Sequence, residues 1–482
     1  MSQQVEVAIV GAGSSGLCAA IKLKEAGINN FVILEKGNGL GGTWYWNQYP
    51  GAECDVQSHL YSFSFEQNPN WSQPFAGQRE ILDYLEHCAE KYDLLKHIRF
   101  EKTVTDCVWS ETESRWSITQ SDGDKISAKI FISALGMFNN IVWPKIEGIE
   151  TFQGDSFHSA RWKKNVNLKD KRIGVVGIAA SAVQFVPEIV DQAQKLFLYQ
   201  RTANWVVPKP NNPYTKDELE QFSAQHALLL KSRDDVFKEW DSLCTFRDKK
   251  ILAEIEKSGL ERIAEVENPD IRRKLTPNHP FGCKRPLFSD KYYPVFNRND
   301  VDLITSPISK ISKKGIETAD GFEDLDVIIF STGFETTTYL NAINVTGRGN
   351  VNLKDAWDDG AQAYLGVTTT GFPNLFMLYG PNTNQGCILY MIERQVEYIT
   401  RQIKRMQEEN LKWIDLEPNI MKDFNKDIQK DIKHVDVWQA DCGNDFYYRA
   451  GKSRRLVTQW PNSMTAYKHA IRKSDAGIYS SG

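Results

Sequence analysis

Residues 5–16 of the chain, VEVAIVGAGSSG, join a strand pattern to a glycine-rich turn. The first six residues hardly alternate between polar and apolar side chains, which is typical of a strand covered on both faces. A helical pattern, LCAAIKLKEAG, follows, and a second strand, NFVILEK, carries Glu35 near its end. This order of strand, glycine turn, helix, strand and acid predicts a dinucleotide-binding βαβ unit.

Each glycine of this turn has a physical role in holding a dinucleotide. Gly11 permits the sharp turn, Gly13 lets the backbone approach a pyrophosphate at the helix N-terminus, and Gly16 permits close packing of the helix on the strand. Glu35 can accept hydrogen bonds from the hydroxyl groups of an adenosine ribose. The alternative is an ordinary turn between strand and helix, and the glycines alone do not choose between FAD and NAD.

A second unit begins at residue 172 with RIGVVGIAASAVQFVPEIV. Its turn starts with Gly177, but Ala179 stands where the second glycine is usual, and Ala182 stands at the third position, which tolerates alanine. The following strand, KLFLYQRTANWVVP, ends at Arg201 and Thr202 instead of an acid. A guanidinium and a hydroxyl suit a ribose 2′-phosphate, which indicates NADPH. The alternative for Arg201 is a surface arginine at a strand end.

The order of these patterns predicts an α/β protein with two Rossmann-like dinucleotide-binding domains and a helical subdomain. The segments 131–138, FISALGMF, and 325–335, LDVIIFSTGFE, are similar buried strands that end in small-residue turns. We expect the chain to leave and re-enter the first domain there, so that the NADP domain is inserted in the FAD domain. The expected ranges are 1–140 and 326–482 for the two parts of the FAD domain and 141–325 for the NADP domain, with a helical insertion at about 214–275.

Composition excludes several other classes of protein. The 482 residues carry 58 basic and 62 acidic side chains, so no basic excess indicates a nucleic acid or an anionic membrane as a partner. No apolar stretch has the length of a membrane span, and the N-terminus lacks the pattern of a secretory signal. Eight cysteines, from Cys18 to Cys442, form no CxxC pair. We therefore expect reduced thiols and a cytoplasmic location, and the histidine spacing predicts no metal site.

Between the two units, residues 152–162 read FQGDSFHSARW, which is similar to the FxGxxxHxxxW fingerprint of type I Baeyer–Villiger monooxygenases. The related flavin-containing monooxygenases usually have Phe or Tyr at the position of Trp162. Two further segments resemble the same family. They are residues 41–55, GGTWYWNQYPGAECD, and residues 283–301, CKRPLFSDKYYPVFNRNDV. Lys163 departs from the Pro or Asp that normally ends the fingerprint. The resemblance spans nearly the whole chain and weakens toward the C-terminus.

The resemblance implies FAD at the first unit, NADPH at the second, and oxygen transfer to a ketone through a C4a-peroxyflavin, which gives an ester or lactone. Sulfide oxidation is expected as well. In the family an arginine after a lysine holds the anionic oxygen, and these map to Arg285 and Lys284. The carboxylate that orients the arginine maps to Asp55, and the rings of Trp44 and Tyr61 would flank the flavin. His158 is expected to be structural rather than catalytic.

The expected catalytic residues are therefore Arg285 and Asp55, with a helix cap as the alternative for Asp55 and a surface position as the alternative for Arg285. The expected partners are a small ketone or sulfide and O₂, in a monomer or small homo-oligomer. Two alternatives remain: an N- or S-oxygenating flavin monooxygenase, and a flavin-bound redox sensor with little turnover, which Ala179 and Lys163 would favour. The expected cofactor contacts are Gly11, Gly13, Ser15, Gly16, Glu35, Thr43, Trp44, Asp55, Tyr61, Val104, Gly177, Ser181, Gln184, Arg201, Thr202, Lys284 and Arg285.

Overall fold

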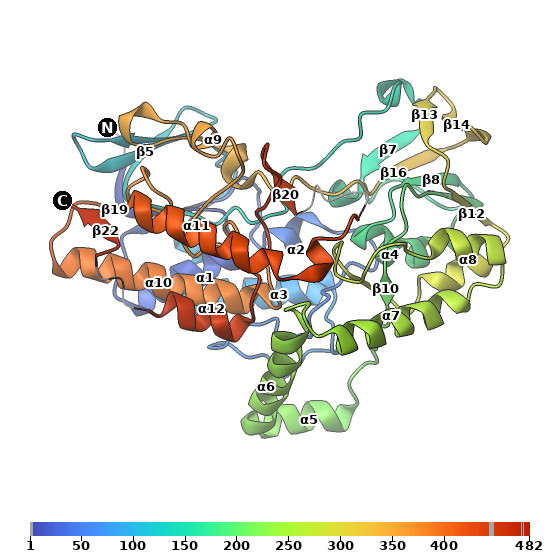
Figure 1. The fold of residues 1–482 in the computed structure, drawn as a ribbon, viewed down its shortest axis with the longest axis horizontal. Coiled ribbons are helices and arrows are strands. Elements are labelled where there is room, and N and C mark those ends of the chain that lie inside the picture. Colours follow the sequence, from blue (N-terminus) through green and yellow to red (C-terminus); the bar gives the residue numbers. More distant parts are fainter. Residues whose placement is uncertain (1–2, 443–447, 474, 476) are drawn as a thin grey trace.

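The structure, a computed structural model, describes residues 3–442, 448–473, 475 and 477–482. It consists of two α/β lobes, each built on its own sheet, with a pair of helices below them (Figure 1). Both chain ends lie in the first lobe. This arrangement confirms the predicted fold class of two Rossmann-like domains with a helical subdomain.

The first sheet has β1 at its centre, parallel to β2 on one side and to β6 on the other. Its strands follow the order β17-β4-β5-β6-β1-β2-β3, and β18 also pairs with β6. The apolar residues of β1 are almost completely buried, as their near-continuous pattern predicts. The strands are β1 (Gln3–Val10), β2 (Phe31–Leu34), β3 (Ile98–Arg99), β4 (Val104–Ser110), β5 (Arg115–Gln120), β6 (Lys125–Ser133), β17 (Asn344–Thr346) and β18 (Leu375–Met377).

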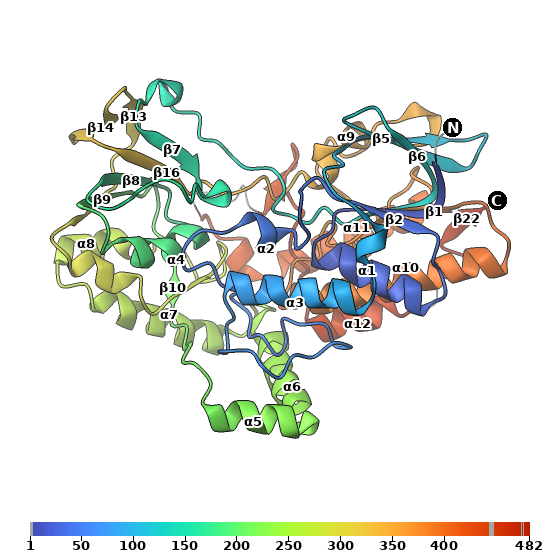
Figure 2. The same cartoon turned by 180° about the vertical axis from the view of Figure 1, so that it is seen from behind.

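Helices from both ends of the chain cover one face of this sheet. Figure 2 shows α1, α3 and α10 side by side, and α1 packs against both of the others. The C-terminal segment therefore completes the first lobe. The helices of this lobe are α1 (Ser14–Glu25), α2 (Thr43–Trp46), α3 (Gln78–Lys91), α9 (Leu353–Ala356), α10 (Ile388–Glu408), α11 (Pro418–Lys433) and α12 (Met464–Ile471).

The second sheet is entirely parallel, in the order β12-β9-β8-β16-β7. A small antiparallel sheet of β13, β14 and β15 precedes β16, much as β4 and β5 precede β6 in the first lobe. The elements are β7 (Asp155–His158), β8 (Arg172–Val176), α4 (Ala180–Ile189), β9 (Lys195–Tyr199), β12 (Val301–Ile304), β13 (Ile308–Ile311), β14 (Gly315–Thr318), β15 (Gly321–Asp324) and β16 (Val327–Phe330).

The position of β16 corrects the expected domain boundary between residues 325 and 326. This strand pairs with β8 and β7, so Val327–Phe330 belong to the second sheet. The chain returns to the first sheet only after Phe330, with β17 at Asn344–Thr346. The two-part first domain and the inserted second domain otherwise remain our division of the chain.

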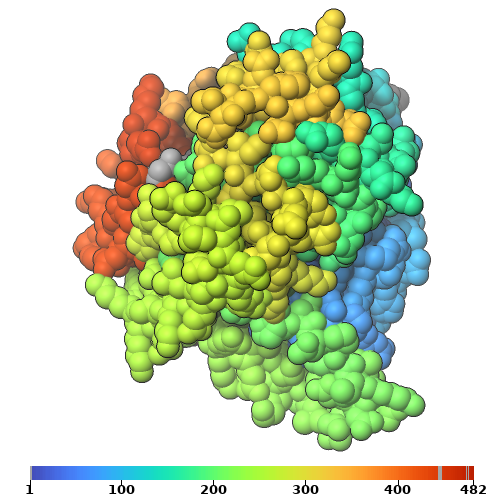
Figure 3. Space-filling model, turned by 90° about the vertical axis from the view of Figure 1, so that its right-hand side faces the viewer, coloured from blue at the N-terminus to red at the C-terminus, as the bar shows by residue number. Residues whose placement is uncertain are grey.

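Four helices occupy the region expected to form the helical insertion. Arg233 on α6 donates to the backbone oxygens of His59, Leu60 and Ser62, so this region is fixed to the first lobe. Figure 3 shows the green residues of α5 and α6 protruding at the lower end of the molecule. The helices are α5 (Lys216–Ala224), α6 (His226–Leu243), α7 (Lys249–Ala264) and α8 (Pro269–Leu275), and the short strands β10 (Val206–Val207) and β11 (Leu287–Phe288) flank them.

One disulfide contradicts the expectation that all thiols are reduced. Cys283 and Cys442 are bonded, with Cα atoms 5.9 Å apart, a usual separation for a disulfide. The bond joins the loop that carries Lys284 to a segment 159 residues further along the chain. Sequence spacing gave no indication of it, because neither cysteine has a close partner in the chain. Among the described residues, no helix is both long and apolar enough to cross a bilayer.

Candidate active site

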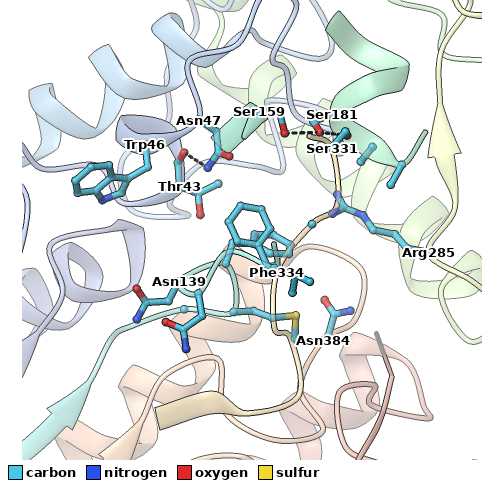
Figure 4. Close-up of a pocket in the computed structure, with 18 of the residues that line it drawn as sticks. Thr43, Trp46, Asn47, Asn139, Ser159, Ser181, Arg285, Ser331, Phe334 and Asn384 are labelled. Atoms are coloured by element: carbon cyan, nitrogen blue, oxygen red, sulfur yellow. Dashed lines mark hydrogen bonds between the residues drawn. The ribbon is translucent and has the colours of Figure 1, made fainter. Parts of the chain in front are cut away.

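A cavity of about 1370 Å³ lies between the lobes and is lined by both glycine turns. Pockets for one small molecule usually measure about 300–1,000 Å³, so this one has room for more than a single ligand. Every expected site residue lines the cavity except Gly16. Figure 4 shows part of its wall, with Arg285 pointing inward from the second lobe and Phe334 near the centre.

The first turn has the backbone that its glycines predict. Gly11 has φ of 110°, and a Cβ there would lie 2.5 Å from the backbone oxygen of Ala134, which follows β6. A Cβ at Gly16 would overlap the backbone oxygen of Gly11, so Gly16 serves helix packing rather than ligand contact. No side chain caps α1, which begins after Gly13, so its first N–H groups face the cavity unpaired by a cap. Such a helix start suits a phosphate.

Glu35 is buried and held in one orientation by backbone donors. Its Oε2 accepts from Ala12 N at 2.8 Å, and its Oε1 accepts from Gly37 N at 2.8 Å. Each carboxylate oxygen can accept a further hydrogen bond. The side chain lines the cavity, so its remaining acceptor sites are available for the ribose hydroxyls of an adenosine.

The second turn has the same backbone as the first, despite Ala179. Gly177 has φ of 94°, and a Cβ there would lie 2.5 Å from the backbone oxygen of Ser331, which follows β16. Ala179 has φ of −86°, an ordinary value for alanine, and its side chain is exposed to the cavity. The helix α4, which begins after Ala179, has no side-chain cap either. This turn therefore also suits a phosphate.

A row of three serine hydroxyls fixes the start of α4 (Figure 4). Ser181 Oγ lies 2.9 Å from Ser159 Oγ and 2.6 Å from Ser331 Oγ. Ser159 follows β7 and Ser331 follows β16, so the row ties the helix to two strand ends. Only Ser181 could be predicted from the sequence, because the other two serines are distant in the chain and have no pattern of their own.

Arg201, Thr202 and Lys284 form a cationic group at the end of β9. Lys284 Nζ donates to Thr202 Oγ1 at 2.9 Å. Burial lowers the pKa of Lys284, and the neighbouring charge of Arg201 lowers it further. Within the described part of the chain, neither cation forms an ion pair with a carboxylate. Two cations beside a hydroxyl suit a dianion such as a 2′-phosphate.

Aromatic rings line the part of the cavity next to the first turn. Trp44 Nε1 donates to Tyr61 Oη at 3.2 Å, and the two rings meet edge to face at 5.8 Å. Phe138 and Phe334 lie on the two segments that connect the lobes, and their ring centres are 5.2 Å apart. These contacts give a largely apolar wall with a defined shape, as expected for a site that holds a flat ring system.

Asp55 and Arg285 meet as expected, from segments far apart in the chain. Arg285 Nη2 lies 3.4 Å from Asp55 Oδ2, and the guanidinium lies 5.6 Å from the centre of the Phe138 ring. Asn204 Nδ2 donates to the backbone oxygen of Arg285, which fixes the loop. Asp55 also contacts Lys209, which sequence analysis did not identify, since a lysine after a short strand has no distinctive pattern.

His158 has the features of a structural residue. Its Nδ1 accepts from Ala160 N at 3.1 Å, which caps a short helical turn. Burial and the charge of Arg161 lower the pKa of His158 to about 4, so the ring is neutral at neutral pH. Trp162 packs on Phe157 and Phe185 in the second lobe. Residues 152–162 therefore contribute packing between β7 and α4, and Lys163, which follows them, is exposed.

The helical insertion contributes an apolar part of the cavity wall. Trp240 Nε1 donates to Gln57 Oε1 at 2.6 Å, which fixes this wall to the first lobe. The sequence pattern of this region is typical of a solvated helical cap, but its position beside the cavity indicates that it also shapes the cavity entrance. The lining residues from this region are Trp240, Leu243, Cys244 and Phe246.

Comparison with known proteins agrees with this geometry. Residues 4–240 match the model of the flavin-binding monooxygenase-like family. The chain is 37% identical to a Baeyer–Villiger monooxygenase of Pseudomonas aeruginosa, with 99% of this chain and 92% of the relative covered. It superposes on cyclohexanone monooxygenase from Rhodococcus sp. Phi1 bound to NADP⁺ with a TM-score of 0.90, at 29% identity and coverage of 100% and 99%.

A second solved structure, OTEMO in complex with FAD and NADP, has a TM-score of 0.89 to this chain, 28% identity and full coverage of both chains. The family resemblance and both cofactors expected from the sequence are thereby confirmed. The chain belongs to the Baeyer–Villiger monooxygenases within the flavin-binding monooxygenase-like family, and it is an NADPH-dependent flavoprotein monooxygenase that uses FAD.

Proposed function

We propose that Asp55 and Arg285 make this protein a ketone oxygenase that inserts one oxygen atom beside the carbonyl group and gives an ester or lactone. The observation that carries the proposal is their ion pair at the wall of a cavity that both nucleotide turns share. FAD, when bound and reduced by NADPH, would activate O₂, of which one oxygen atom enters the ketone and the other leaves as water. The protein has to bind both nucleotides, hold the developing negative charge and exclude water.

Arg285 stabilises the negative charge that forms on oxygen during the transfer. A guanidinium stays protonated at any physiological pH and offers several donors, so it can hold an oxyanion without losing its own charge. Asp55 orients it through Oδ2. The rings of Trp44, Tyr61 and Phe334 line the same cavity and limit access of water to the charged atoms.

The two nucleotides are assigned to the two turns. Glu35 and the start of α1 hold the adenosine and pyrophosphate of FAD, and the start of α4 holds the pyrophosphate of NADPH. Arg201, Thr202 and Lys284 hold the 2′-phosphate that distinguishes NADPH from NADH. The apolar side of the helical insertion, with Trp240 and Phe246, borders the substrate. We further propose a cytoplasmic location, because six of the eight cysteines are free and buried and the chain has one disulfide, Cys283–Cys442, rather than a disulfide framework.

The test is a panel of aliphatic, cyclic and aromatic ketones, with NADPH and O₂ supplied and the products identified by mass. We expect a product that is heavier than the ketone by one oxygen atom, about 16 Da. This product should hydrolyse as an ester or lactone does. Oxidation of a sulfide does not discriminate, because an N- or S-oxygenating enzyme does it too. NADPH consumption with hydrogen peroxide but no ester from any ketone would contradict the proposal and favour the redox sensor.

A further inference from the structure

Lys209 is a buried lysine that the oxygenation site has not so far used. It follows β10 and its side chain is only 2% exposed. A lysine is almost never buried to this degree unless its charge is paired. Its Nζ lies 2.9 Å from Glu53 Oε1 and 3.1 Å from Asp55 Oδ1, so it pairs with two carboxylates at once.

The two oxygens of Asp55 therefore face two different cations. Oδ1 contacts Lys209 Nζ, with Gln184 Nε2 at 3.5 Å on the same oxygen. Oδ2 contacts Arg285 Nη2 at 3.4 Å. The Lys209 contact is the shorter of the two, and its side chain is the more buried. Asp55 is thus held mainly by its contact with Lys209. Arg285 therefore contacts a carboxylate whose other oxygen is already bound to Lys209.

The carboxylate on the far side of Lys209 is fixed as well. Glu53 Oε2 accepts from Asn211 Nδ2 at 3.0 Å, while its backbone oxygen accepts from Gln184 Nε2 at 3.0 Å. Tyr49 Oη in turn donates to Gln184 Oε1 at 2.9 Å. These hydrogen bonds hold Glu53 and Gln184 in place, and thereby fix the position of the Lys209 ammonium.

The charges of this group balance, with two carboxylates against two cations. Burial opposes the charged form of Lys209, but the charges of Asp55 and Glu53 outweigh burial and raise its pKa. The ammonium therefore stays protonated. Without it, Arg285 would be the cation nearest to two carboxylates. A guanidinium presents a fork that fits both oxygens of one carboxylate, so it would be drawn toward Asp55.

We propose that Lys209 is a positioning residue for oxygen transfer, which occupies Oδ1 of Asp55 and neutralises Glu53 so that Asp55 engages Arg285 through Oδ2 alone. The proposal rests on the proposed role of Arg285 in oxygenation. Lys209 does not line the cavity, so its role is to position Arg285 and not to contact oxygen or ketone. It sets how far the guanidinium extends from Asp55 into the cavity.

The first test is the crystal structure of the holoenzyme with Lys209→Met, compared with wild type. The proposal expects Arg285 to move toward Asp55 and to contact both of its oxygens. The double variant Lys209→Met/Glu53→Gln removes one charge of each sign but leaves Oδ1 of Asp55 without its cation, so Arg285 should stay drawn toward Asp55 as in Lys209→Met. An Arg285 side chain that stays in place in Lys209→Met would overturn the proposal. This readout does not depend on which substrate the enzyme oxidises.

The second test separates the two halves of the reaction in the same variants. Misplacement of a catalytic group by about 1 Å can cost on the order of a hundredfold, so ester formation in Lys209→Met should fall about tenfold to a hundredfold. Anaerobic flavin reduction by NADPH should stay near the wild-type rate, and the double variant should lose ester formation to a similar extent as Lys209→Met. Equal loss in both halves would show a merely structural lysine. Recovery of ester formation in the double variant would show that Lys209 acts through charge balance and not through Oδ1 of Asp55, and would overturn the proposal.

Lys291→Met is the matched control, because Lys291 Nζ pairs with Glu188 at 2.9 Å but does not line the cavity. It should leave both halves unchanged. If Lys209→Met does not fold, Glu53→Gln alone carries the test. Lys209 would then pair only with Asp55 and draw it away, so the distance from Asp55 to Arg285 should lengthen. A wild-type enzyme that makes no ester would refute the proposed function, while the structures would still decide the role of Lys209.

Discussion

The two nucleotide-binding turns have the same backbone but differ in what lies beside their second residue. Gly13 has φ of −78° and ψ of −174°, and Ala179 has φ of −86° and ψ of −165°. Neither value requires glycine. A Cβ at Gly13, however, would lie 3.3 Å from Gly42 Cα, whereas the methyl group of Ala179 faces the cavity. In the first turn the loop at Gly42 limits the size of the second residue. In the second turn only a bound ligand would limit it.

The first glycine of each turn shows the opposite situation, because both lobes impose the same restriction. Gly11 and Gly177 have positive φ, and each lies under the backbone oxygen of a residue that leaves its own sheet. These are Ala134 after β6 and Ser331 after β16. The crossing segments are equivalent in the two lobes, so the turn that they cover cannot accept a side chain in either.

The largest effect should come from Gly11→Ala and Gly177→Ala. Each adds a Cβ about 2.5 Å from a backbone oxygen at a φ that alanine rarely adopts. We expect Gly11→Ala to purify without FAD, and Gly177→Ala to keep FAD but bind NADPH too weakly to saturate. Flavin absorbance of the purified proteins and NADPH titration measure this. A Gly177→Ala protein that lost FAD as readily as Gly11→Ala would break the assignment of one turn to each nucleotide.

Arg201→Ala should have the next largest effect, and only at the second turn. A charge-assisted contact to a phosphate contributes about 1.5–3 kcal/mol, which corresponds to roughly tenfold to a hundredfold in binding. The Michaelis constant for NADPH should rise by that factor, while the constant for NADH and the FAD content should not change. Steady-state kinetics with both nucleotides measures it. Equal increases for NADPH and NADH would refute the 2′-phosphate site.

The smallest effect should come from exchanging the second residue of each turn. Ala179→Gly removes a methyl group that faces the cavity, so NADP⁺ should bind more tightly by less than about tenfold, which corresponds to less than ~1.4 kcal/mol. Gly13→Ala should weaken FAD binding by more, because the added Cβ also meets the backbone of Gly42. Calorimetric titration of both variants gives the comparison. If Gly13→Ala proves the milder change, the neighbouring loop does not impose the restriction.

Local patterns predicted the two units because each is a contiguous run of strand, turn and helix. The roles of Gly11 and Glu35 follow from such runs, and so does the placement of Arg201 at a strand end. Which sheet a short buried strand joins does not follow from its pattern. β16 has the same apolar character as β6, and only its pairing with β8 assigns it to the second lobe.

Features formed by segments far apart in the chain could not be predicted from the sequence alone. The disulfide joins Cys283 to Cys442 across 159 residues, and no spacing rule covers that separation. Lys209 gains its role from Glu53 and Asp55, which lie in another lobe of the chain. Asp55 and Arg285 could be paired beforehand only because the family resemblance gave both positions.

Arg285 is proposed to serve oxygen transfer and not flavin reduction. Losing one preorganised donor to an oxyanion costs about 3–4 kcal/mol, or roughly a hundredfold to a thousandfold in rate. The most direct test mixes Arg285→Ala with NADPH without oxygen, and then with oxygen and a ketone, in a stopped-flow instrument with product analysis. We expect the flavin to be reduced and then to return to the oxidised form with release of hydrogen peroxide, while almost no ester forms. Ester formation at a rate near that of the wild-type enzyme would contradict this role of Arg285.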